Sequence, residues 1–381
     1  MKTETIQVMA GAAMLSAFTY IPILARDYLS ADELFITLLV GAYSAASFIS
    51  SYIFGRAGDI YGRRIVVRLG LLVSVITFGL LMFIQSPEVL LIARILGGFS
   101  MGVYPGALAA YAFESKMKMG RFASFGAAGW GIGTFLAGFA AGYNIYYAFL
   151  MSTVFLSIAF ASAMALPPIE RKKIAVPLFP IETIKRNWSV YTAVLVRHST
   201  ASAVWTLWPL FLTDIGGDPF IIGIVQMSNA IPQVIVMIAI TDRFDCKLLI
   251  SMGMISSALT FFWFTLATNI LEIIPTQFLL GFSWACLYVG ALKYVTERNE
   301  DRSTASGLLS SVLALSMVIG PIIAAAIYSI WPGYIPIMYN AVVFSLIGYV
   351  IFVITSRREV AKELAIEKSL KKTTTTLTCD T

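Results

Sequence analysis

Charge is scarce in this sequence: only 13% of its 381 residues are Asp, Glu, Lys or Arg, whereas 58% are hydrophobic. Soluble domains of average composition carry about 25% charged residues. The scarcity therefore excludes an ordinary soluble globular protein. Apolar runs of roughly 20 residues recur from one end of the chain to the other, and each is long enough to cross the hydrocarbon core of a bilayer as a helix. We interpret the chain as a polytopic membrane protein.

Cysteine, histidine and mid-span acids are also rare. Cys246, Cys286 and Cys379 fall in a loop, a span and the C-terminal tail, which excludes a disulfide framework. His198 is the single histidine, and no Asp or Glu lies in the middle of a span, so the clustered acids and histidines that a membrane-embedded enzyme would need are missing. No Gly-x-x-x-x-Gly-Lys nucleotide loop occurs either. We expect no catalytic residues, no metal and no cofactor, and a membrane-embedded enzyme stays a remote alternative.

The apolar runs predict twelve spans. They cover residues 6–25, 33–54, 65–85, 88–113, 121–142, 145–166, 188–213, 219–240, 248–268, 271–294, 303–330 and 333–355. If both termini are cytoplasmic, all of the 27 Lys and Arg lie on the cytoplasmic side except Arg26, which lies outside, and Arg94 and Arg197, which lie within spans. This bias predicts the orientation in the cytoplasmic membrane. The net charge of +6 then reflects topology and not a nucleic-acid partner.

Four parts are predicted along the chain. Residues 1–166 form an N-terminal six-helix bundle, 167–187 a proline-containing cytoplasmic linker, 188–355 a C-terminal six-helix bundle and 356–381 a cytoplasmic tail. One constant shift aligns Gly98-Phe99-Ser100 with Gly281-Phe282-Ser283, and the same shift aligns Glu114 with Glu297, which indicates an internal repeat of the two halves. The tail is interpreted either as a short helix against anionic headgroups or as solvated chain.

The loop between the second and third spans carries the most specific pattern, Gly55-Arg56-Ala57-Gly58-Asp59-Ile60-Tyr61-Gly62-Arg63-Arg64. Gly55 permits close approach of helices, and Gly62 suits a tight turn. Asp59 can pair with Arg63, four residues on, or sit at a helix N-terminus. The alternative is a positively charged loop with a capping acid. The second half has the related segment Asp242-Arg243-Phe244-Asp245-Cys246-Lys247, in which the turn glycine is replaced.

This pattern and the twelve spans in two halves resemble the major facilitator superfamily (MFS) of secondary transporters. The run Arg94-x-x-x-Gly98-x-x-x-Gly102 is similar to a motif in the fourth span of that family. Gly129-x-x-x-Gly133 resembles the fifth-span motif of its antiporters, although Thr134 stands where that motif has proline. The resemblance implies an all-α membrane fold of two pseudo-symmetric six-helix bundles that rock about a central cavity.

The resemblance also implies a gate at the cytoplasmic side. Its residues would be Gly55, Asp59, Gly62, Arg63 and Arg64, and Asp59 would pair with basic residues and with the start of the eleventh span. Ser303 is the predicted N-cap of that span, which would leave free backbone N–H groups facing the loop.

The two arginines within spans are candidate site residues because a charge in the membrane is expensive. Arg197 lies about 13 Å from the start of its span, near the bilayer midplane, and we assign it to a substrate cavity. Arg94 lies about 9 Å from the outer end of its span, where a structural arginine bonded to carbonyls is an equal alternative. His198 could carry a coupling proton, or it could be a core histidine.

Further cavity candidates are polar and aromatic side chains at helical spacing. They are Trp205 and Trp208 on the seventh span, Gln226, Asn229 and Gln233 on the eighth, and Gln277, Trp284 and Tyr288 on the tenth. Hydrogen bonds between helices are the alternative role of the polar ones.

We predict a secondary active transporter of a small organic solute, working as a monomer in the bilayer with an ion or proton as its potential coupling partner. Two arginines without an acid favour an anionic or neutral solute over a cation. A multidrug-like proton antiporter is the alternative, favoured by the fifth-span pattern. A sensor with a transporter fold is disfavoured because no large signalling domain is present.

Overall fold

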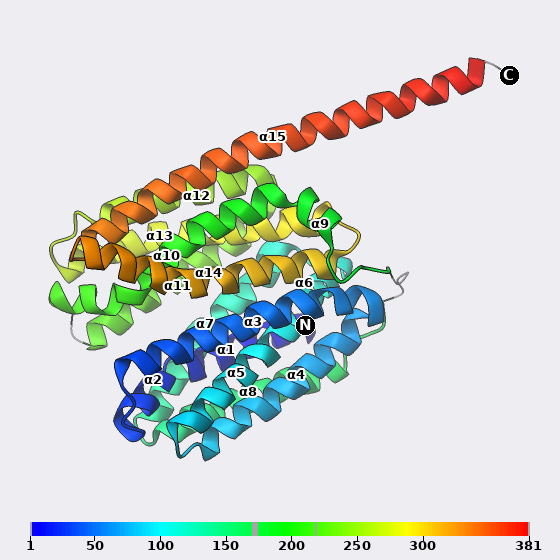
Figure 1. Cartoon of the computed structure of the whole chain (residues 1–381). Helices are drawn as coiled ribbons and strands as arrows, with labels where there is room; N and C mark the ends of the chain where they lie inside the picture. The colour runs from blue at the N-terminus through cyan, green and yellow to red at the C-terminus, as the bar shows by residue number, and fades with distance from the viewer. Residues whose placement is uncertain (1, 170–173, 218, 380–381) are drawn as a thin grey trace.

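The computed structural model describes residues 2–169, 174–217 and 219–379 (Figure 1). Every regular element in these ranges is a helix, as the composition predicts. Ten helical segments are long and apolar enough to cross a membrane by length and composition. The helices α10 and α11 occupy the positions of the predicted seventh and eighth spans. Each predicted span therefore corresponds to one helix or to two or three consecutive helical pieces.

The first half consists of eight α-helices and two short turns. Their bounds are α1 (Lys2–Phe18), α2 (Ile21–Ile23), the π-helical turn η1 (Leu24–Tyr28), α3 (Glu33–Tyr61), α4 (Arg63–Gly79), the 3₁₀ turn η2 (Leu80–Phe83), α5 (Pro87–Val103), α6 (Pro105–Glu114), α7 (Met119–Ala141) and α8 (Ile145–Met164). The predicted fourth span is split at Tyr104, because Pro105 has no N–H for the helical ladder.

The second half follows a short helix in the linker. The bounds are α9 (Ile181–Arg186), α10 (Trp188–Asp214), α11 (Pro219–Ala239), the 3₁₀ turn η3 (Thr241–Arg243), α12 (Cys246–Phe264), α13 (Ile270–Glu297), α14 (Arg302–Ile330) and α15 (Ile335–Cys379). The predicted last span, 333–355, agrees with the apolar part of α15, Ile335–Arg357, to within two residues. Helix α15 continues to Cys379 and runs past the bundle (Figure 1), since no Gly or Pro interrupts residues 356–379.

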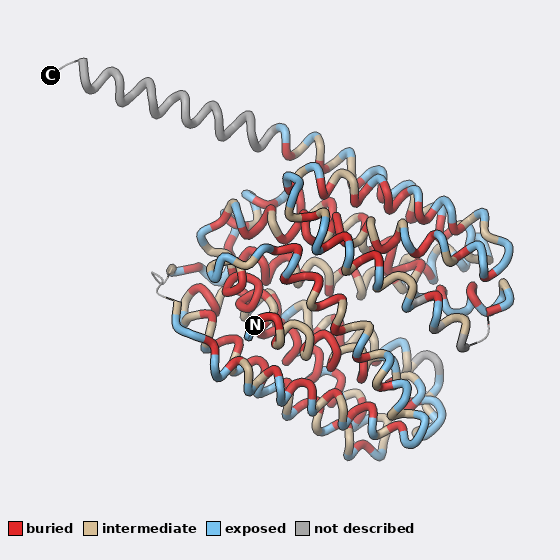
Figure 2. The backbone as a smooth tube through the Cα atoms, turned by 180° about the vertical axis from the view of Figure 1, so that it is seen from behind, coloured by how far each residue is buried: buried red, intermediate tan, exposed pale blue. Residues whose placement is uncertain are grey.

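Large apolar side chains are exposed on the surface of the molecule. The residues that face the inside of the bundle are buried (Figure 2). Large side chains such as Phe83, Phe139, Leu271 and Ile322 are each more than half exposed. A soluble protein would bury such side chains, whereas a bilayer solvates them. The two halves meet where α3 and α6 pack on α14 and where α7 packs on α11 and α13.

Glycines let helices approach closely within the first half. A Cβ on Gly102 of α5 would lie 2.7 Å from the carbonyl oxygen of Ser47 on α3. Gly129 and Gly133 of α7 face the backbone of Val8 and Ala12 on α1 in the same way. The glycine patterns of the fourth and fifth spans therefore serve helix packing in this structure.

Candidate functional site

A cavity of about 240 Å³ lies between the two halves. Helices from both halves contribute its walls. The lining residues are Gln7, Ala10, Gly11, Met14, Tyr43, Ser44, Ser47, Met101, Tyr104, Pro105, Ala123, Gly126, Ala127, Trp130, Gln233, Met237, Trp284, Tyr288, Ser310, Leu313, Ala314 and Met317. This is the position in which a transporter of two bundles holds its cargo.

The cavity wall is uncharged, aromatic and rich in methionine. Among the described lining residues none is Asp, Glu, Lys, Arg or His. Trp284 and Tyr288 of α13 stack on each other with ring centroids 5.4 Å apart and an interplanar angle of 13°. Gln7 and Gln233 supply amide groups from opposite halves. Such a wall suits a flat and largely apolar solute with a few hydrogen-bonding groups.

Arg197 lies directly behind this aromatic wall. Its guanidinium carbon is 5.9 Å from the centroid of the Trp284 ring and 5.5 Å from that of Phe261. Its Nε donates a 2.9 Å hydrogen bond to Ser257 Oγ of α12, and the residue is 1% exposed. Arg197 therefore faces α12 and α13 inside the second half and reaches the cavity only through the Trp284 ring.

His198 belongs to the same layer as Arg197. Its ring stacks on Trp284 with centroids 5.1 Å apart, and its Nδ1 lies 3.4 Å from Arg197 Nη1. The structure thus brings Arg197, His198, Trp284 and Tyr288 together, with only the last two on the cavity surface.

Arg94 has an equivalent place behind the wall of the first half. Its guanidinium lies 4.1 Å from the ring centroid of Tyr43, which lines the cavity, and 5.6 Å from that of Phe18. The residue is 3% exposed and its Nε has no hydrogen-bond partner. Neither Arg94 nor Arg197 forms an ion pair within the part of the chain that is described. Burying a guanidinium without a carboxylate partner costs free energy, so both arginines are candidates for a functional role.

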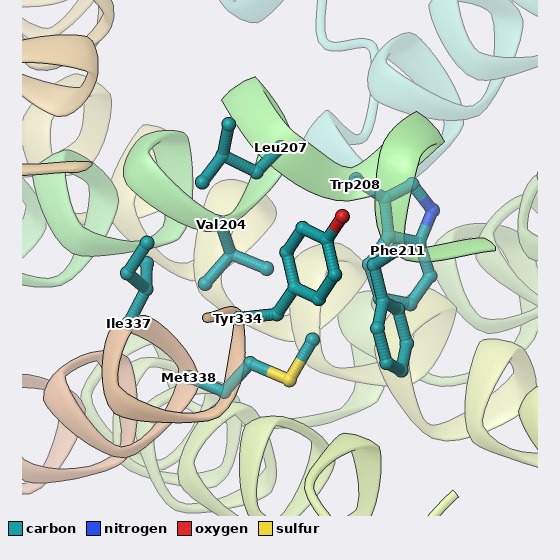
Figure 3. Close-up of a pocket in the computed structure, with 7 residues that line it drawn as sticks. All are labelled: Val204, Leu207, Trp208, Phe211, Tyr334, Ile337 and Met338. Atoms are coloured by element: carbon teal, nitrogen blue, oxygen red, sulfur yellow. The ribbon is translucent and has the colours of Figure 1, made fainter. Parts of the chain in front are cut away.

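Trp205 and Trp208 lie away from the central cavity. Trp208 lines a separate apolar pocket of about 10 Å³ between α10 and α15, with Phe211 and Tyr334 (Figure 3). Trp205 packs edge-on against Trp208, with ring centroids 5.5 Å apart. The pocket has room for about one water molecule. The structure therefore places both tryptophans in an aromatic cluster within the second half.

The remaining polar candidates bond between helices or lie outside the description. Asn229 Nδ2 is 3.5 Å from the carbonyl oxygen of Gln277, which links α11 to α13, and Gln277 itself is buried. Gln233 Nε2 lies 3.4 Å from Asn229 Oδ1, and Gln233 alone of these three lines the cavity. The side chain of Gln226 lies outside the described residues.

The carboxylate of Asp59 connects the two halves at one end of the molecule, which we call the Asp59 end. Asp59 Oδ2 accepts hydrogen bonds from the backbone N–H and the hydroxyl of Thr304, at 2.8 and 2.7 Å. Its Oδ1 lies 3.4 Å from the N–H of Ser303 and 3.1 Å from Arg63 Nη2. Asp59 is 4% exposed. An acid of α3 thus caps the N-terminus of α14, where the helix macrodipole favours a negative charge.

The prediction that Ser303 is the N-cap of this helix was wrong. Helix α14 begins at Arg302, and Asp301 is its N-cap without a side-chain bond. Ser303 lies inside the first turn, its N–H faces Asp59, and its Oγ has no partner. The N–H groups of Ser303 and Thr304 bind Asp59 of the opposite half, as the resemblance implied.

The other gate candidates surround Asp59. Arg63 binds the Ala110 carbonyl at 3.2 Å and pairs with Glu114, whose other oxygen lies 3.7 Å from Arg302 of the second half. Arg64 lines a cavity of about 250 Å³ beside Asp59 and Glu114.

Two glycines shape the backbone of this loop. Gly62 has a φ of +106°, a left-handed conformation that favours glycine. A Cβ on Gly55 would lie 2.9 Å from the Cα of Gly307, so α3 and α14 touch at their backbones. The motif residues and the second half are therefore in direct contact.

Asp242 makes a weaker link of the same kind, which the sequence interpretation missed. It follows α11, and its Oδ1 accepts a 3.2 Å hydrogen bond from the N–H of Gly120 at the start of α7. The shift between the two halves aligns Asp242 with Asp59, so the repeat contained the signal. The pseudo-symmetric partners differ because Asp59 holds two residues of α14 and Asp242 holds one of α7.

The linker also joins the halves at this end. Ile174 N–H donates to the Asp59 carbonyl at 3.2 Å, and Arg56 binds the Val176 carbonyl at 2.9 Å. At its far end Asn187 and Asn299 exchange amide hydrogen bonds of 3.1 and 2.9 Å. The predicted linker residues Arg171, Lys172 and Lys173 lie outside the described ranges.

Known proteins match this chain over nearly its whole length. The model of a family described as Major Facilitator Superfamily matches residues 5–196 and again residues 190–378. The Quinolone resistance protein NorA of Staphylococcus aureus is 25% identical over 345 residues, which cover 83% of this chain and 86% of that protein. Multidrug resistance protein 1 of Bacillus subtilis is 24% identical over 325 residues, which cover 78% and 81%.

Solved structures show the same fold. The human organic anion transporter MFSD10 (TETRAN) has a TM-score of 0.82 at 14% identity, over 92% of this chain and 98% of that one. A variant of the nucleoside transporter NupG has a TM-score of 0.64 at 13% identity, over 94% and 98%. The predicted arrangement of two pseudo-symmetric six-helix bundles is confirmed.

Proposed function

The chain belongs to the Major Facilitator Superfamily and is a membrane transporter, and we propose that its cargo is a flat organic anion carried through the central cavity by alternating access. The proposal extends the family assignment to a substrate class. Its site consists of the aromatic cavity wall and of the two arginines behind it.

The observation that carries the proposal is the pair of buried guanidinium groups without carboxylate partners. Arg94 lies behind Tyr43 in one half and Arg197 behind Trp284 in the other, so positive potential enters the cavity from both sides. No described lining residue offers a compensating acid. In a low-dielectric cavity this field attracts an anion and repels a cation.

The aromatic wall explains the flat shape of the proposed cargo. The stacked pair of Trp284 and Tyr288 offers π-faces for an aromatic ring, and the amides of Gln7 and Gln233 can hydrogen-bond its polar edges. A small rotation of Tyr43 would expose the guanidinium of Arg94, whose Nε has no partner, to a carboxylate or sulfonate. The printed function of MFSD10, organic anion transport, agrees with this class.

A second candidate is efflux of several lipophilic compounds. Methionines on both sides of the cavity, Met14, Met101, Met237 and Met317, provide an adaptable surface that accepts different shapes. The names of the two relatives, a quinolone resistance protein and a multidrug resistance protein, agree with this candidate. His198 would be its proton carrier, since it is the single histidine and stacks on the cavity residue Trp284.

Topology and assembly complete the proposal. The protein works as a monomer in the cytoplasmic membrane, with both termini and the Asp59 end in the cytoplasm. Residues 1–166 and 188–355 move as two bodies joined by the linker 167–187, and the gate residues of the Asp59 loop close one side of the cavity. The basic residues reflect this topology and need no nucleic-acid partner.

The test uses purified full-length protein and three matched compounds: an aromatic carboxylate, its neutral methyl ester and an amine analogue. We expect the carboxylate to raise the melting temperature most and to compete for uptake or efflux in liposomes. Arg94→Met should weaken carboxylate binding by about 10-fold to 100-fold, because a hydrogen bond to a charged group is worth roughly 1.5–3 kcal/mol. Arg197→Met should weaken it less, because Arg197 acts on the cargo only as a charge behind the Trp284 ring.

Arg68→Met is the matched control, because Arg68 donates to the carbonyls of Ala163 and Met164, away from the cavity. Selective binding of the amine, unchanged in both arginine variants, would overturn the anion proposal and favour multidrug efflux.

A further inference from the structure

Another cavity, of about 460 Å³, lies between α12 and α15. These two helices lie on the side of the second half that faces away from the first half (Figure 1). We call this cavity the α12–α15 groove. It is lined by Lys247, Leu248, Ser251, Tyr349, Phe352, Val353, Ser356 and Arg357. The groove does not touch the central cavity, because the two have no lining residue in common.

Two basic side chains lie at the mouth of the groove. Lys247 is in the first turn of α12, and Arg357 is on α15 just beyond the predicted end of its span. Neither forms an ion pair within the described ranges. The neighbouring acid Asp245 accepts the backbone N–H of Lys247 at 2.9 Å and serves as the N-cap of α12. The described side chains that line the groove therefore carry two positive charges and no negative one.

The rest of the groove is apolar and continues onto an apolar surface. Phe352 forms a buried part of its wall, and Leu248 is 47% exposed beside it. Further along α12, Ile255 and Leu259 share the face of Leu248, and on α15 Ile354 precedes Arg357 by one turn. These four leucine and isoleucine side chains are each at least 40% exposed. This surface runs from the charged mouth toward the middle of the membrane.

We propose that the α12–α15 groove binds one anionic phospholipid. The phosphate lies between Lys247 and Arg357, which donate to its oxygens, and the acyl chains follow the apolar faces of α12 and α15. Charge complementarity selects the headgroup, since basic side chains at a membrane surface attract anionic lipids. A soluble phosphate would gain the two charges but would leave the apolar wall uncovered.

The predicted consequence is structural support for the second half. The lipid would bridge the start of α12 to α15 at the Asp59 end. There α12 and α15, which belong to the second half, are not covered by helices of the first half. The bound lipid would stabilise folded protein in proportion to its affinity and concentration.

Native mass spectrometry of the full-length protein tests this directly. The probes are phosphatidylglycerol, phosphatidylcholine of the same acyl chains, and inorganic phosphate. We expect one retained phosphatidylglycerol, weak retention of phosphatidylcholine, and no stabilisation by phosphate. The double variant Lys247→Gln, Arg357→Gln should bind phosphatidylglycerol about 30-fold more weakly, from two lost attractions of the usual size.

Two further variants make the test decisive. The conservative exchange Lys247→Arg with Arg357→Lys should keep the lipid. The control Lys118→Gln with Arg243→Gln removes two exposed basic residues of the same end outside the groove, and it should also keep the lipid. Equal retention of phosphatidylglycerol by the groove variant and the control would overturn the proposal. Stabilisation by inorganic phosphate alone would overturn it as well, because it would assign the site to a soluble anion.

Discussion

Replacing Asp59 with asparagine should weaken the contact that holds the two halves together at the Asp59 end. The carboxylate accepts three hydrogen bonds from α14, from the N–H and hydroxyl of Thr304 and the N–H of Ser303. Asparagine keeps one carbonyl acceptor but loses the charge and the second oxygen. A hydrogen bond to a charged group contributes about 1.5–3 kcal/mol, so we expect a loss of roughly 2–4 kcal/mol of closure energy.

This loss should shift the equilibrium between closed and open Asp59 ends by about 30-fold to 1000-fold. The assay is a distance distribution between spin labels at Lys118 and Arg243, which are exposed and belong to opposite halves. The labels are placed after replacement of the three native cysteines. Asp59→Asn should populate a longer distance, and transport should become slower because the closed state is no longer held.

Asp242→Asn is the matched control for this prediction. It removes the negative charge from a single 3.2 Å bond to Gly120, and we expect about a fivefold shift from the loss of roughly 1 kcal/mol. The decisive result is that Asp59→Asn shifts closure more than Asp242→Asn does. If Asp59→Asn keeps the wild-type distance distribution and transport rate, or if Asp242→Asn has the larger effect, then the Asp59 contact does not control closure.

Three further substitutions test the same end of the molecule. Gly106→Ala should destabilise the closed state by about 1–3 kcal/mol, because its Cβ would lie 2.7 Å from Gly307 N, while Gly41→Ala, with open space at its Cβ, should leave the label distances unchanged. Asn187→Ala should lower the melting temperature in detergent, since it removes the two amide hydrogen bonds between Asn187 and Asn299, worth roughly 1–3 kcal/mol together, while Asn299 keeps the Val295 carbonyl and Arg186 as partners; an unchanged value would mean that water replaces the pair. Thr304→Val should shift closure less than Asp59→Asn, because it removes only the hydroxyl bond, and an equal shift would place the effect in α14 itself.

Much of the fold followed from composition and periodicity. The apolar runs placed all twelve spans, because a helix in hydrocarbon must be both long and apolar. They missed the break between α1 and α2, just before Pro22, and the break at Tyr104, just before Pro105. Both prolines are visible in the sequence. The end of α15 was missed because a charged helix and a solvated tail have the same composition.

The site was less accessible to sequence analysis. Helical spacing shows which residues share a face but not which neighbouring helix that face meets. Arg197 and Trp208 were both assigned to the cavity from one face of α10, yet Arg197 bonds to Ser257 and Trp208 packs against Phe264. Gln7 and Tyr43, which do line the cavity, had no local signal.

The sequence by itself determined that this chain crosses a membrane as two related halves, because hydropathy and the repeat are properties of the linear chain. It also singled out Asp59, because the spacing of the glycines and arginines around it forms a specific pattern in the loop between the second and third spans. The family resemblance implied that Asp59 meets the start of α14, and the tertiary structure identified its donors there as Thr304 and Ser303. Only the tertiary structure decided that Arg94 and Arg197 lie behind aromatic rings. Those contacts join helices far apart in sequence, and their distances depend on how the helices cross.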